Sequence, residues 1–328
     1  MINRESPRSF RIEISNKTIE TPFFFPAISS VNRTFPQLEY LKILCASGYP
    51  GFLISSYDVY HSDKTDKAEI HKTLSDSTDE GTIILLDSGN FEAYWHSDNK
   101  WSITKFRSVL NDITIDLCLS FDVFWEDSKS LKEHTDQTIS HVAKTASFQK
   151  TGLTIPIIHS QKKYLSTITK NIARKMNPEI IAIPERELGQ SIFERSETIQ
   201  RIREELDKTG KPIALHLLGT GNPVSILIYS LCGADMFDAC EWYKYLINFK
   251  GGSISDFSHG DLLNCSCPAC KEKEAAYPAK TMVHNLIFYT KLMGDIRKSL
   301  ISGSIDDLLS EYLSFKSAKC VKGLARLK

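Results

Sequence analysis

The chain has 328 residues, of which 41% are hydrophobic and 24% are charged, so it can bury a sizeable core and is not predicted to be disordered. Lysine plus arginine equals aspartate plus glutamate at 40 each, which excludes a strongly basic protein that binds nucleic acid through its overall charge. The sequence contains no run of 18 apolar residues and no charged-then-apolar leader, so we expect a cytoplasmic protein that does not span a membrane.

Eight short apolar segments recur along the chain with helical stretches between them. Gly, Pro, Ser or Asp bounds each segment, which is typical of strands buried on both faces of a parallel sheet. The segments are Thr21–Ile28, Gly51–Ser56, Thr82–Gly89, Leu117–Phe124, Leu153–Ser160, Glu179–Glu185, Pro212–Gly219 and Ala234–Cys240. Eight such strands that alternate with helices predict an α/β fold whose sheet closes into a (β/α)8 barrel.

The stretches between the strands carry helical patterns. Apolar residues within Ser196–Lys211 fall at helical spacing, and Gly210 followed by Pro212 predicts the end of that helix. The polar stretch Ser62–Gly81 predicts a surface helix with its loops. Because no repeat, low-complexity stretch or Pro/Ser-rich linker divides the chain, we expect a single domain over residues 1–328.

Three aspartates lie at the ends of predicted strands: Asp87 on the third, Asp122 on the fourth and Asp238 on the eighth. One such aspartate alone is more often a helix N-cap. In a β/α barrel, however, the C-terminal strand ends meet at one mouth, so the three are expected to converge there. Converging carboxylates favour chemistry at an anomeric carbon, where one attacks an oxocarbenium-like centre and another moves a proton on the leaving group.

Near the C-terminus lie three closely spaced cysteines and a histidine: Cys265, Cys267, Cys270 and His284. They form a complete donor set for tetrahedral zinc and leave no open position, so we expect a structural zinc and not a Lewis acid. An iron-sulfur cluster would need a fourth cysteine nearby, and the remaining alternative is unligated cysteines beside an unrelated histidine. The other cysteines are expected to be buried thiols: Cys45, Cys118, Cys232, Cys240 and Cys320.

Several motifs, in order along the chain, resemble those of the tRNA-guanine transglycosylases and their DNA-modifying relatives. RIEISNKTIETPFFFPAISSV is similar to the family's first strands, LLDSGNFE to its Asp-Ser-Gly-Gly-Phe-Gln signature, and LSFDVF to its Phe-Asp motif. HLLGTGNPVSILIYSLCGADMFDAC is similar to the Gly-x-Gly-x-Pro segment that leads to Asp-Met-Phe-Asp-Cys. The Cys-x-Cys-x-x-Cys run and HNLIFYTKLMGDIRKSL complete a match that covers nearly the whole chain.

This resemblance implies a TIM barrel with a zinc-binding subdomain at residues 250–290. It also implies a reaction that exchanges guanine in a polynucleotide for a 7-deazaguanine base. Asp238 would attack the ribose C1′ and form a covalent glycosyl-enzyme. Asp87 would act as the acid/base group on the departing and incoming bases. Two displacements at one carbon agree with retention of the glycosidic configuration.

The resemblance also implies residues that bind the base. Asp122 would accept hydrogen bonds from its N1–H and exocyclic amine, which are two adjacent donors that suit one carboxylate. Ser88 belongs to the same site through the Asp-Ser-Gly signature, and Phe91 would stack on the base. His159 stands where the family has a glutamine and would donate to the base O6, with an ordinary loop histidine as the alternative.

The departures from the family pattern lie on the substrate side. Asn90 replaces the second glycine of the signature and Glu92 its glutamine, while the segment 181–189 replaces a Gly-Gly-Leu loop. That loop is expected to set which 7-substituent is accepted. After Asp238 the tRNA enzymes carry a Pro-Thr-Arg element that contacts the anticodon loop, whereas this chain reads ACEWYKYLINFKGG.

The catalytic motifs match the family, whereas the element that contacts tRNA does not. In this combination the chain resembles the DNA-directed branch of the family, which inserts 7-cyano-7-deazaguanine (preQ0) into DNA. A target guanine in duplex DNA would have to be flipped out of the stack. Trp242, Tyr243, Lys244 and Tyr245 would then stack on the opened duplex and contact its phosphates. The alternative is that these four residues begin the next helix as half-buried aromatics.

Three other functions stay open. The first is a divergent tRNA-guanine transglycosylase that reads tRNA with other residues. The second is a non-catalytic accessory subunit that keeps the zinc and binds a partner chain, although retention of all three aspartates argues against it. The third is a zinc hydrolase, against which the closed donor set speaks. The protein partners considered are a second copy of the chain and accessory DNA-modification proteins.

Overall fold

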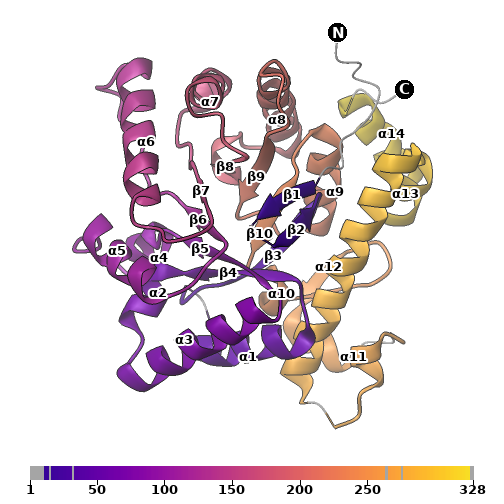
Figure 1. Cartoon of the computed structure of the whole chain (residues 1–328). Coiled ribbons are helices and arrows are strands. Elements are labelled where there is room, and N and C mark those ends of the chain that lie inside the picture. Colours follow the sequence, from indigo (N-terminus) through magenta and orange to yellow (C-terminus); the bar gives the residue numbers. More distant parts are fainter. Residues whose placement is uncertain (1–10, 15, 32, 263–264, 275, 326–328) are drawn as a thin grey trace.

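A computed structural model of the chain describes residues 11–14, 16–31, 33–262, 265–274 and 276–325. All eight predicted strands are present and pair in parallel in the order β7-β6-β5-β4-β3-β10-β9-β8 (Figure 1). The strands are β3 (Phe23–Ile28), β4 (Gly51–Ser55), β5 (Ile83–Asp87), β6 (Leu117–Leu119), β7 (Leu153–Ile155), β8 (Ile180–Pro184), β9 (Ala214–Leu218) and β10 (Met236–Ala239).

The two edges of this sheet meet just beyond β7. The backbone N–H of Ala182 on β8 donates to the carbonyl of Pro156, and the N–H of Ile158 donates to the carbonyl of Ala182, each at 2.9 Å. Both bonds follow the parallel pattern, with Ile157 opposite Ala182. The sheet therefore curls into a nearly closed barrel, which confirms the predicted TIM-like α/β fold.

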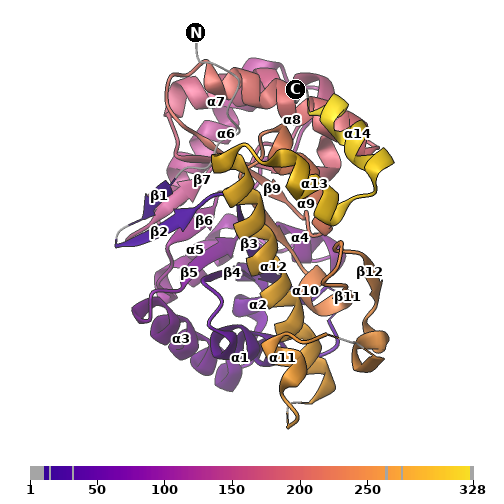
Figure 2. The same cartoon turned by 90° about the vertical axis from the view of Figure 1, so that its right-hand side faces the viewer.

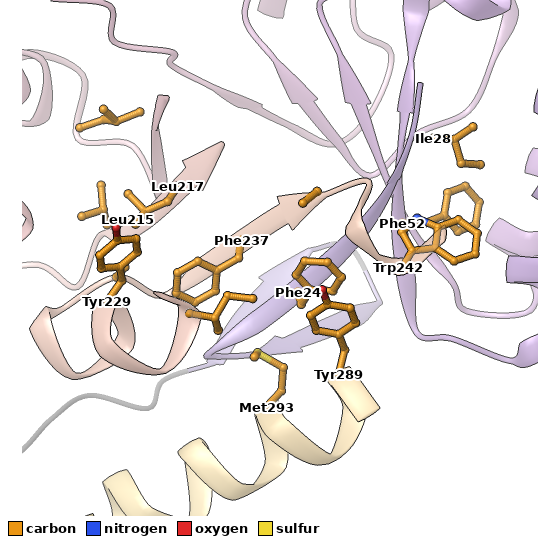
Figure 3. Packing of buried hydrophobic residues seen from close by; sticks show 14 of the residues in the cluster. Phe24, Ile28, Phe52, Leu215, Leu217, Tyr229, Phe237, Trp242, Tyr289 and Met293 are labelled. Atoms are coloured by element: carbon orange, nitrogen blue, oxygen red, sulfur yellow. The ribbon is translucent and has the colours of Figure 1, made fainter. Parts of the chain in front are cut away.

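Successive residues of the strands face the barrel interior and the surrounding helices in turn. On β3, Phe25 packs inside the barrel, whereas Phe24 faces outward and stacks on Tyr289 of a covering helix, with ring centroids 3.9 Å apart. Figure 3 shows this outer layer, where Phe24, Tyr289 and Met293 lie together. Both faces of the strands are apolar for this reason, and the continuous apolar segments of the sequence have the same cause.

Helices alternate with the strands and cover the outside of the barrel (Figures 1 and 2). The longer ones are α1 (Gln37–Ser47), α3 (Lys64–Asp79), α5 (Ile103–Asp112), α6 (Leu131–Ala146), α7 (Lys162–Met176), α8 (Ile192–Asp207), α9 (Pro223–Cys232) and α12 (Tyr277–Ser302). Short helices follow the strands at the C-terminal end of the barrel: α2 (Ser56–His61), α4 (Asn90–Trp95), η1 (Glu185–Glu187) and α10 (Glu241–Lys244).

An N-terminal hairpin covers the opposite end of the barrel. It consists of β1 (Arg11–Ile14) and β2 (Lys17–Glu20), whose isoleucines are buried with the interior of the barrel. Lys17 on β2 is buried, and its Nζ donates to Asp116 Oδ2 at 3.0 Å and to the carbonyl of Thr82 at 2.8 Å. Both acceptors come just before a strand, so the C-terminal strand ends form the mouth that stays accessible.

Two predicted helices are confirmed, with one changed boundary. Ser62–Gly81 contains α3, and the apolar face predicted within Ser196–Lys211 is buried on α8. However, α8 ends at Asp207, and Gly210 with φ +80° lies in the turn beyond it. The helix ends early because the backbone N–H and the hydroxyl of Thr209 both donate to the carbonyl of Leu206.

The C-terminal part of the chain adds small elements around α12. They are β11 (Tyr245–Ile247), β12 (Ile254–Asp256), η2 (Phe257–Leu262), α11 (Pro268–Lys271), α13 (Ile305–Tyr312) and α14 (Phe315–Leu324). Figures 1 and 2 both place α11 beside the first turns of α12. None of the described helices is long and apolar enough to cross a membrane.

The scattered cysteines are less uniformly buried than expected. Cys118 and Cys232 are buried, and Cys45 and Cys240 are partly buried. Cys320 is exposed, so the prediction of a buried thiol is wrong there. It lies on α14, which buries only Val321, so most of this helix faces solvent.

Candidate active site and metal centre

The turn after β5 holds Asp87 at the mouth of the barrel. The backbone N–H of Gly89 donates to Asp87 Oδ2 at 2.9 Å, and Gly89 has φ +80°. A Cβ atom at Gly89 would lie 2.7 Å from the Cβ of Tyr57, closer than real side chains approach. Only glycine fits this tight turn, so the glycine of the signature motif has a structural reason.

Asp122 lies in the loop after β6 and is held by three donors. Its Oδ2 accepts from the Ser88 hydroxyl at 2.5 Å and from Asn90 Nδ2 at 2.7 Å, and its Oδ1 lies 2.6 Å from His159 Nε2. Burial alone would raise the pKa of Asp122, but these hydrogen bonds and the charge of His159 hold it below its ordinary value. Asp122 is therefore an ionised carboxylate. Asn90, a departure from the family motif, contributes to that state.

His159 bridges two carboxylates. Its Nδ1 lies 2.6 Å from Glu187 Oε1 on η1, opposite the contact of Nε2 with Asp122. Burial alone would lower the pKa of His159, but the two carboxylates outweigh it and raise the pKa to about 9. Both ring nitrogens are occupied, so the expected donation from His159 to a base does not fit this arrangement.

Asp87 lies in a different electrostatic setting. Burial, together with the charges of Glu92, Asp122 and Asp238, raises its pKa well above the ordinary value. Glu92 on α4 is itself buried, and its carboxylate accepts from the hydroxyls of Ser29 and Ser55 at 2.5 and 2.7 Å. Burial and the neighbouring Asp58 raise the pKa of Glu92 to about 7. At Asp87, burial and the neighbouring charges outweigh the hydrogen bond from the N–H of Gly89, so the carboxyl group favours the protonated form.

Asp238 faces into the barrel from β10. Met236 packs in the barrel interior and Phe237 on the outer face, where Figure 3 shows it, so the alternation of the strand turns Asp238 inward. His216 Nε2 on the neighbouring β9 lies 2.9 Å from Asp238 Oδ1, and the N–H of Gly219 lies 3.4 Å from Oδ2. His216 is fully buried, and its Nδ1 has no hydrogen-bond partner among the described residues. A hydrogen bond from His216 Nε2–H to Oδ1 would hold Asp238 in this orientation.

These placements bring the three predicted aspartates to one mouth, since the charges of Asp122 and Asp238 both act on Asp87. The raised pKa of Asp87 suits a group that gives a proton, while Asp238 is held in one orientation by His216 and Gly219. Two carboxyl groups whose environments differ in this way suit one acid and one nucleophile. The site can therefore protonate a leaving group and attack the carbon that it leaves.

The predicted nucleic-acid contact of Trp242, Tyr243, Lys244 and Tyr245 needs a correction for its first two residues. Trp242 is fully buried, and its Nε1–H donates to the carbonyl of Ala27 at 2.8 Å; Figure 3 shows it among the core side chains. Tyr243 is also buried. These two residues anchor α10 to the barrel and are not placed to stack on nucleic acid. Lys244 is partly buried and Tyr245 is exposed, so a contact from these two stays a prediction.

Exposed aromatics do lie near the mouth, on α4 directly after the Asp87 turn. Phe91, Tyr94 and Trp95 are 47%, 73% and 59% exposed, and the rings of Phe91 and Tyr94 each contact Trp95 edge-on. Phe91 was expected to stack on the base, and its exposure leaves that prediction open. The whole aromatic face of α4 was not anticipated from the sequence.

Sequence reasoning missed three polar residues of the site: His216, Glu187 and Glu92. A signal existed for His216, because it is a polar residue within the apolar segment PIALHLLG. Glu92 stood out only as a departure from a motif. Glu187 lies in a charged loop sequence, IPERELG, where nothing separates it from Glu185.

The predicted cysteine and histidine cluster forms one compact site. The ligand atoms of Cys265, Cys267, Cys270 and His284 lie within 4.8 Å of one another, and His284 Nδ1 is 3.4 and 3.3 Å from the sulfurs of Cys267 and Cys270. His284 Nε2 lies 2.8 Å from the carbonyl of Ile247. Donation to that carbonyl leaves the lone pair of Nδ1 directed at the sulfurs, as in metal-bound histidines. The four residues can hold one metal ion, and zinc prefers this donor set.

Comparison with known proteins gives a match along almost the whole chain. The family described as Queuine tRNA-ribosyltransferase matches residues 4–317. The tRNA-guanine(15) transglycosylase of Nanoarchaeum equitans is 23% identical over 88% of this chain and 70% of its own length. That of Haloferax volcanii is 19% identical over 90% of this chain and 60% of its own length. The queuine tRNA-ribosyltransferase of Buchnera aphidicola is 24% identical over 91% and 94%.

Proposed function

The chain belongs to the queuine tRNA-ribosyltransferase family, and we propose that it exchanges a guanine base in tRNA for a 7-deazaguanine through a covalent aspartyl intermediate. One observation carries this proposal: the buried Asp87, whose pKa is raised by its surroundings, and Asp238, which His216 holds in place, share one barrel mouth. A base-exchange reaction needs these two roles, because the leaving guanine takes a proton while the ribose carbon is attacked.

In the proposed mechanism, Asp238 attacks C1′ as Asp87 protonates the departing guanine. The incoming base then gives its proton to Asp87 and displaces Asp238. Asp122 would bind the base edge, but a carboxylate has about four lone-pair sites and three of Asp122 are already in use. A base that donates two hydrogen bonds must therefore displace at least one donor, either Ser88 or Asn90.

The choice between tRNA and DNA rests on two different observations. The relatives named above are tRNA-guanine or queuine tRNA enzymes, which favours tRNA over the DNA that the sequence placed first. DNA stays the second candidate, because the segment after Asp238 lacks the Pro-Thr-Arg element. Under that alternative the inserted base is preQ0.

An incorporation assay separates the two candidates. Purified protein is given labelled guanine or 7-cyano-7-deazaguanine with bulk tRNA or with plasmid DNA, and the label in each polymer is counted. Label in tRNA alone supports the proposal, and label in DNA alone replaces tRNA with DNA. Label in neither polymer, from a folded protein that holds its metal, would favour the non-catalytic accessory subunit.

We expect the exposed aromatic face of α4 to bind the polynucleotide, in place of Trp242 and Tyr243. Stacking of one base on an aromatic side chain contributes about 1–3 kcal/mol. Trp95→Ala should therefore weaken tRNA binding about tenfold, as measured by filter binding or fluorescence anisotropy at fixed salt. Phe315→Ala removes an 88% exposed aromatic from α14 and is the matched control. Equal affinities for both variants and the wild type would exclude this surface.

We also propose that Cys265, Cys267, Cys270 and His284 hold a structural zinc within a subdomain at residues 250–290 of a single catalytic domain. All four ligands come from the protein, so the ion would link α11 to α12 and supply folding free energy and no chemistry. The lone pair of His284 Nδ1 and the three thiolates would face the ion.

Cys267→Ser is expected to lose the zinc and to lower the melting temperature, because metal binding contributes to folding. Zinc content by mass spectrometry of metals and thermal unfolding are the two measurements. Cys320→Ser changes an exposed cysteine outside the cluster and should alter neither. If Cys267→Ser lost turnover while keeping both its zinc and its melting temperature, a structural role would be excluded.

A further inference from the structure

A histidine lies between two carboxylates at the barrel mouth. His159 comes from the loop after β7, and one of the two carboxylates, Glu187, lies on η1. His159 Nε2 lies 2.6 Å from Asp122 Oδ1, and His159 Nδ1 lies 2.6 Å from Glu187 Oε1. The side chain of His159 is 4% exposed, so water does not compete for either nitrogen. Glu187 is fixed in turn, because its Oε2 accepts from the backbone N–H of Ser160 at 2.7 Å.

The contacts of His159 with two carboxylates determine how many protons its ring carries. An ionised carboxylate only accepts hydrogen bonds, so each ring nitrogen that faces one must carry a proton. Asp122 is ionised, since Ser88 and Asn90 donate to its other oxygen. Glu187 accepts from Ser160 on one oxygen and faces His159 with the other. The geometry therefore fits an imidazolium between two carboxylates.

The other charged neighbours leave this assignment intact. His134 on α6 contacts the backbone carbonyl of His159 through its Nε2 at 2.7 Å. Burial lowers the pKa of His134, and the positive charge of His159 lowers it further, so His134 is neutral. The charge of Lys129 also lowers the pKa of His134. The ring of Phe124 lies 4.7 Å from that of His159 and carries no charge.

On the premise of the proposed base exchange, we propose that Glu187 is a positioning residue of the base site: it keeps His159 as an imidazolium, and this cation keeps Asp122 ionised and oriented toward the base. Glu187 does not touch the base in this proposal. It acts through His159, and the unit joins the ends of β6, β7 and β8.

The sign of the pH effect follows from the raised pKa of His159. Its charge is fully present below the ordinary histidine value of 6.5 and is lost as pH rises through about 9. Removal of the Glu187 charge takes away one of the two groups that raise this pKa. An opposite charge at this distance shifts a pKa by about 1–3 units, so the loss of the imidazolium should move to lower pH by that amount in Glu187→Gln.

The first arm of the test needs no substrate. Histidine ring ¹⁵N and ¹H resonances of the full chain are followed from pH 6 to pH 10, with His159→Gln to assign the signal. In the wild type both ring nitrogens should be protonated up to about pH 9. In Glu187→Gln one nitrogen should lose its proton about 1–3 units earlier. A singly protonated ring at pH 7 in the wild type would overturn the proposal.

The second arm measures base exchange with guanine as a function of pH. For Glu187→Gln we expect KM for the base to begin rising about 1–3 pH units below the wild-type break, with kcat nearly unchanged. Glu185→Gln is the matched control on the same short helix, since Glu185 contacts Arg195 and Tyr229 and not His159. Glu187→Asp should restore part of the wild-type profile if charge is what matters.

The outcomes separate this proposal from the function on which it rests. If neither tRNA nor DNA supports exchange by the wild type, the function fails, while the resonances still decide whether Glu187 holds the imidazolium. An imidazolium that responds to Glu187→Gln together with an unchanged KM profile would overturn the positioning role. The same shift in Glu185→Gln would also overturn it, because a general charge effect would then suffice.

Discussion

Asp238→Asn is expected to lower guanine exchange by about 10⁴-fold or more, as loss of a catalytic nucleophile does in other enzymes. The amide keeps the shape of the carboxylate, and its oxygen can still accept from His216 Nε2, so the barrel should fold as before. It has no negative charge with which to form the glycosyl ester. The covalent intermediate should disappear together with turnover.

The measurement is a denaturing gel that detects the protein linked to labelled polynucleotide, run alongside thermal unfolding. Asp235→Asn is an informative control three residues away. Asp235 accepts from Arg203 Nη2 and from the N–H of Leu215, and all three groups are buried, so its replacement should destabilise the fold. Asp235→Asn should thus lower the melting temperature but retain the adduct. Asp238→Asn should do the reverse, and an adduct in that variant would exclude Asp238 as the nucleophile.

Asp87→Asn is expected to lower turnover by about 10²–10⁴-fold, the usual contribution of a general acid/base group. Asparagine can still accept from the N–H of Gly89, so the turn should persist. The lost function is proton transfer to and from the base. Single-turnover release of guanine measures the first of these transfers directly, and its rate should fall in the variant.

The raised pKa of Asp87 predicts the direction of two pH effects. As an acid it works while protonated, so wild-type guanine release should fall as pH rises through its pKa, and this alkaline limb should vanish in Asp87→Asn. A buried carboxyl with a raised pKa also destabilises the fold once it ionises. Asp87→Asn should therefore be more stable than the wild type above that pKa, and the difference should vanish as pH falls toward 3.8.

Glu92→Gln is the companion variant, since it removes one of the charges that raise the pKa of Asp87. It should keep the alkaline limb of guanine release but move it to lower pH. An unchanged limb in both variants would show that another group titrates there. Loss of stability in Asp87→Asn at pH 8 would contradict the buried, uncompensated carboxyl.

Short apolar runs and residue spacing were enough to predict the strands and the cysteine cluster, because both features depend on residues that are close in the sequence. Strand segments are recognised by short apolar runs. In a β/α barrel an aspartate at the C-terminal end of a strand lies at the mouth, independently of how the helices pack. The metal cluster was predictable for the same reason, since Cys265, Cys267 and Cys270 lie within six residues and only His284 comes from elsewhere.

Burial was harder to foresee where a short segment packs against distant parts of the chain. Trp242 follows the nucleophile candidate and has the composition of a stacking residue, yet β3 and α12 enclose it. Its Nε1–H reaches Ala27, and its carbonyl accepts from Asn285 on α12. Sequence spacing carries no signal of these partners, which lie 215 and 43 residues away.

The strands, the fold class, the compact cysteine and histidine cluster and the three aspartates near the strand ends could all be predicted from the sequence. The charges that meet at the barrel mouth become visible only in the folded chain. Glu187, His159 and Asp122 follow three different strands, and their protonation states depend on mutual distances of a few ångströms in a buried environment. The physical reason is that electrostatic coupling acts through space, while the patterns that can be read from a sequence act along the chain.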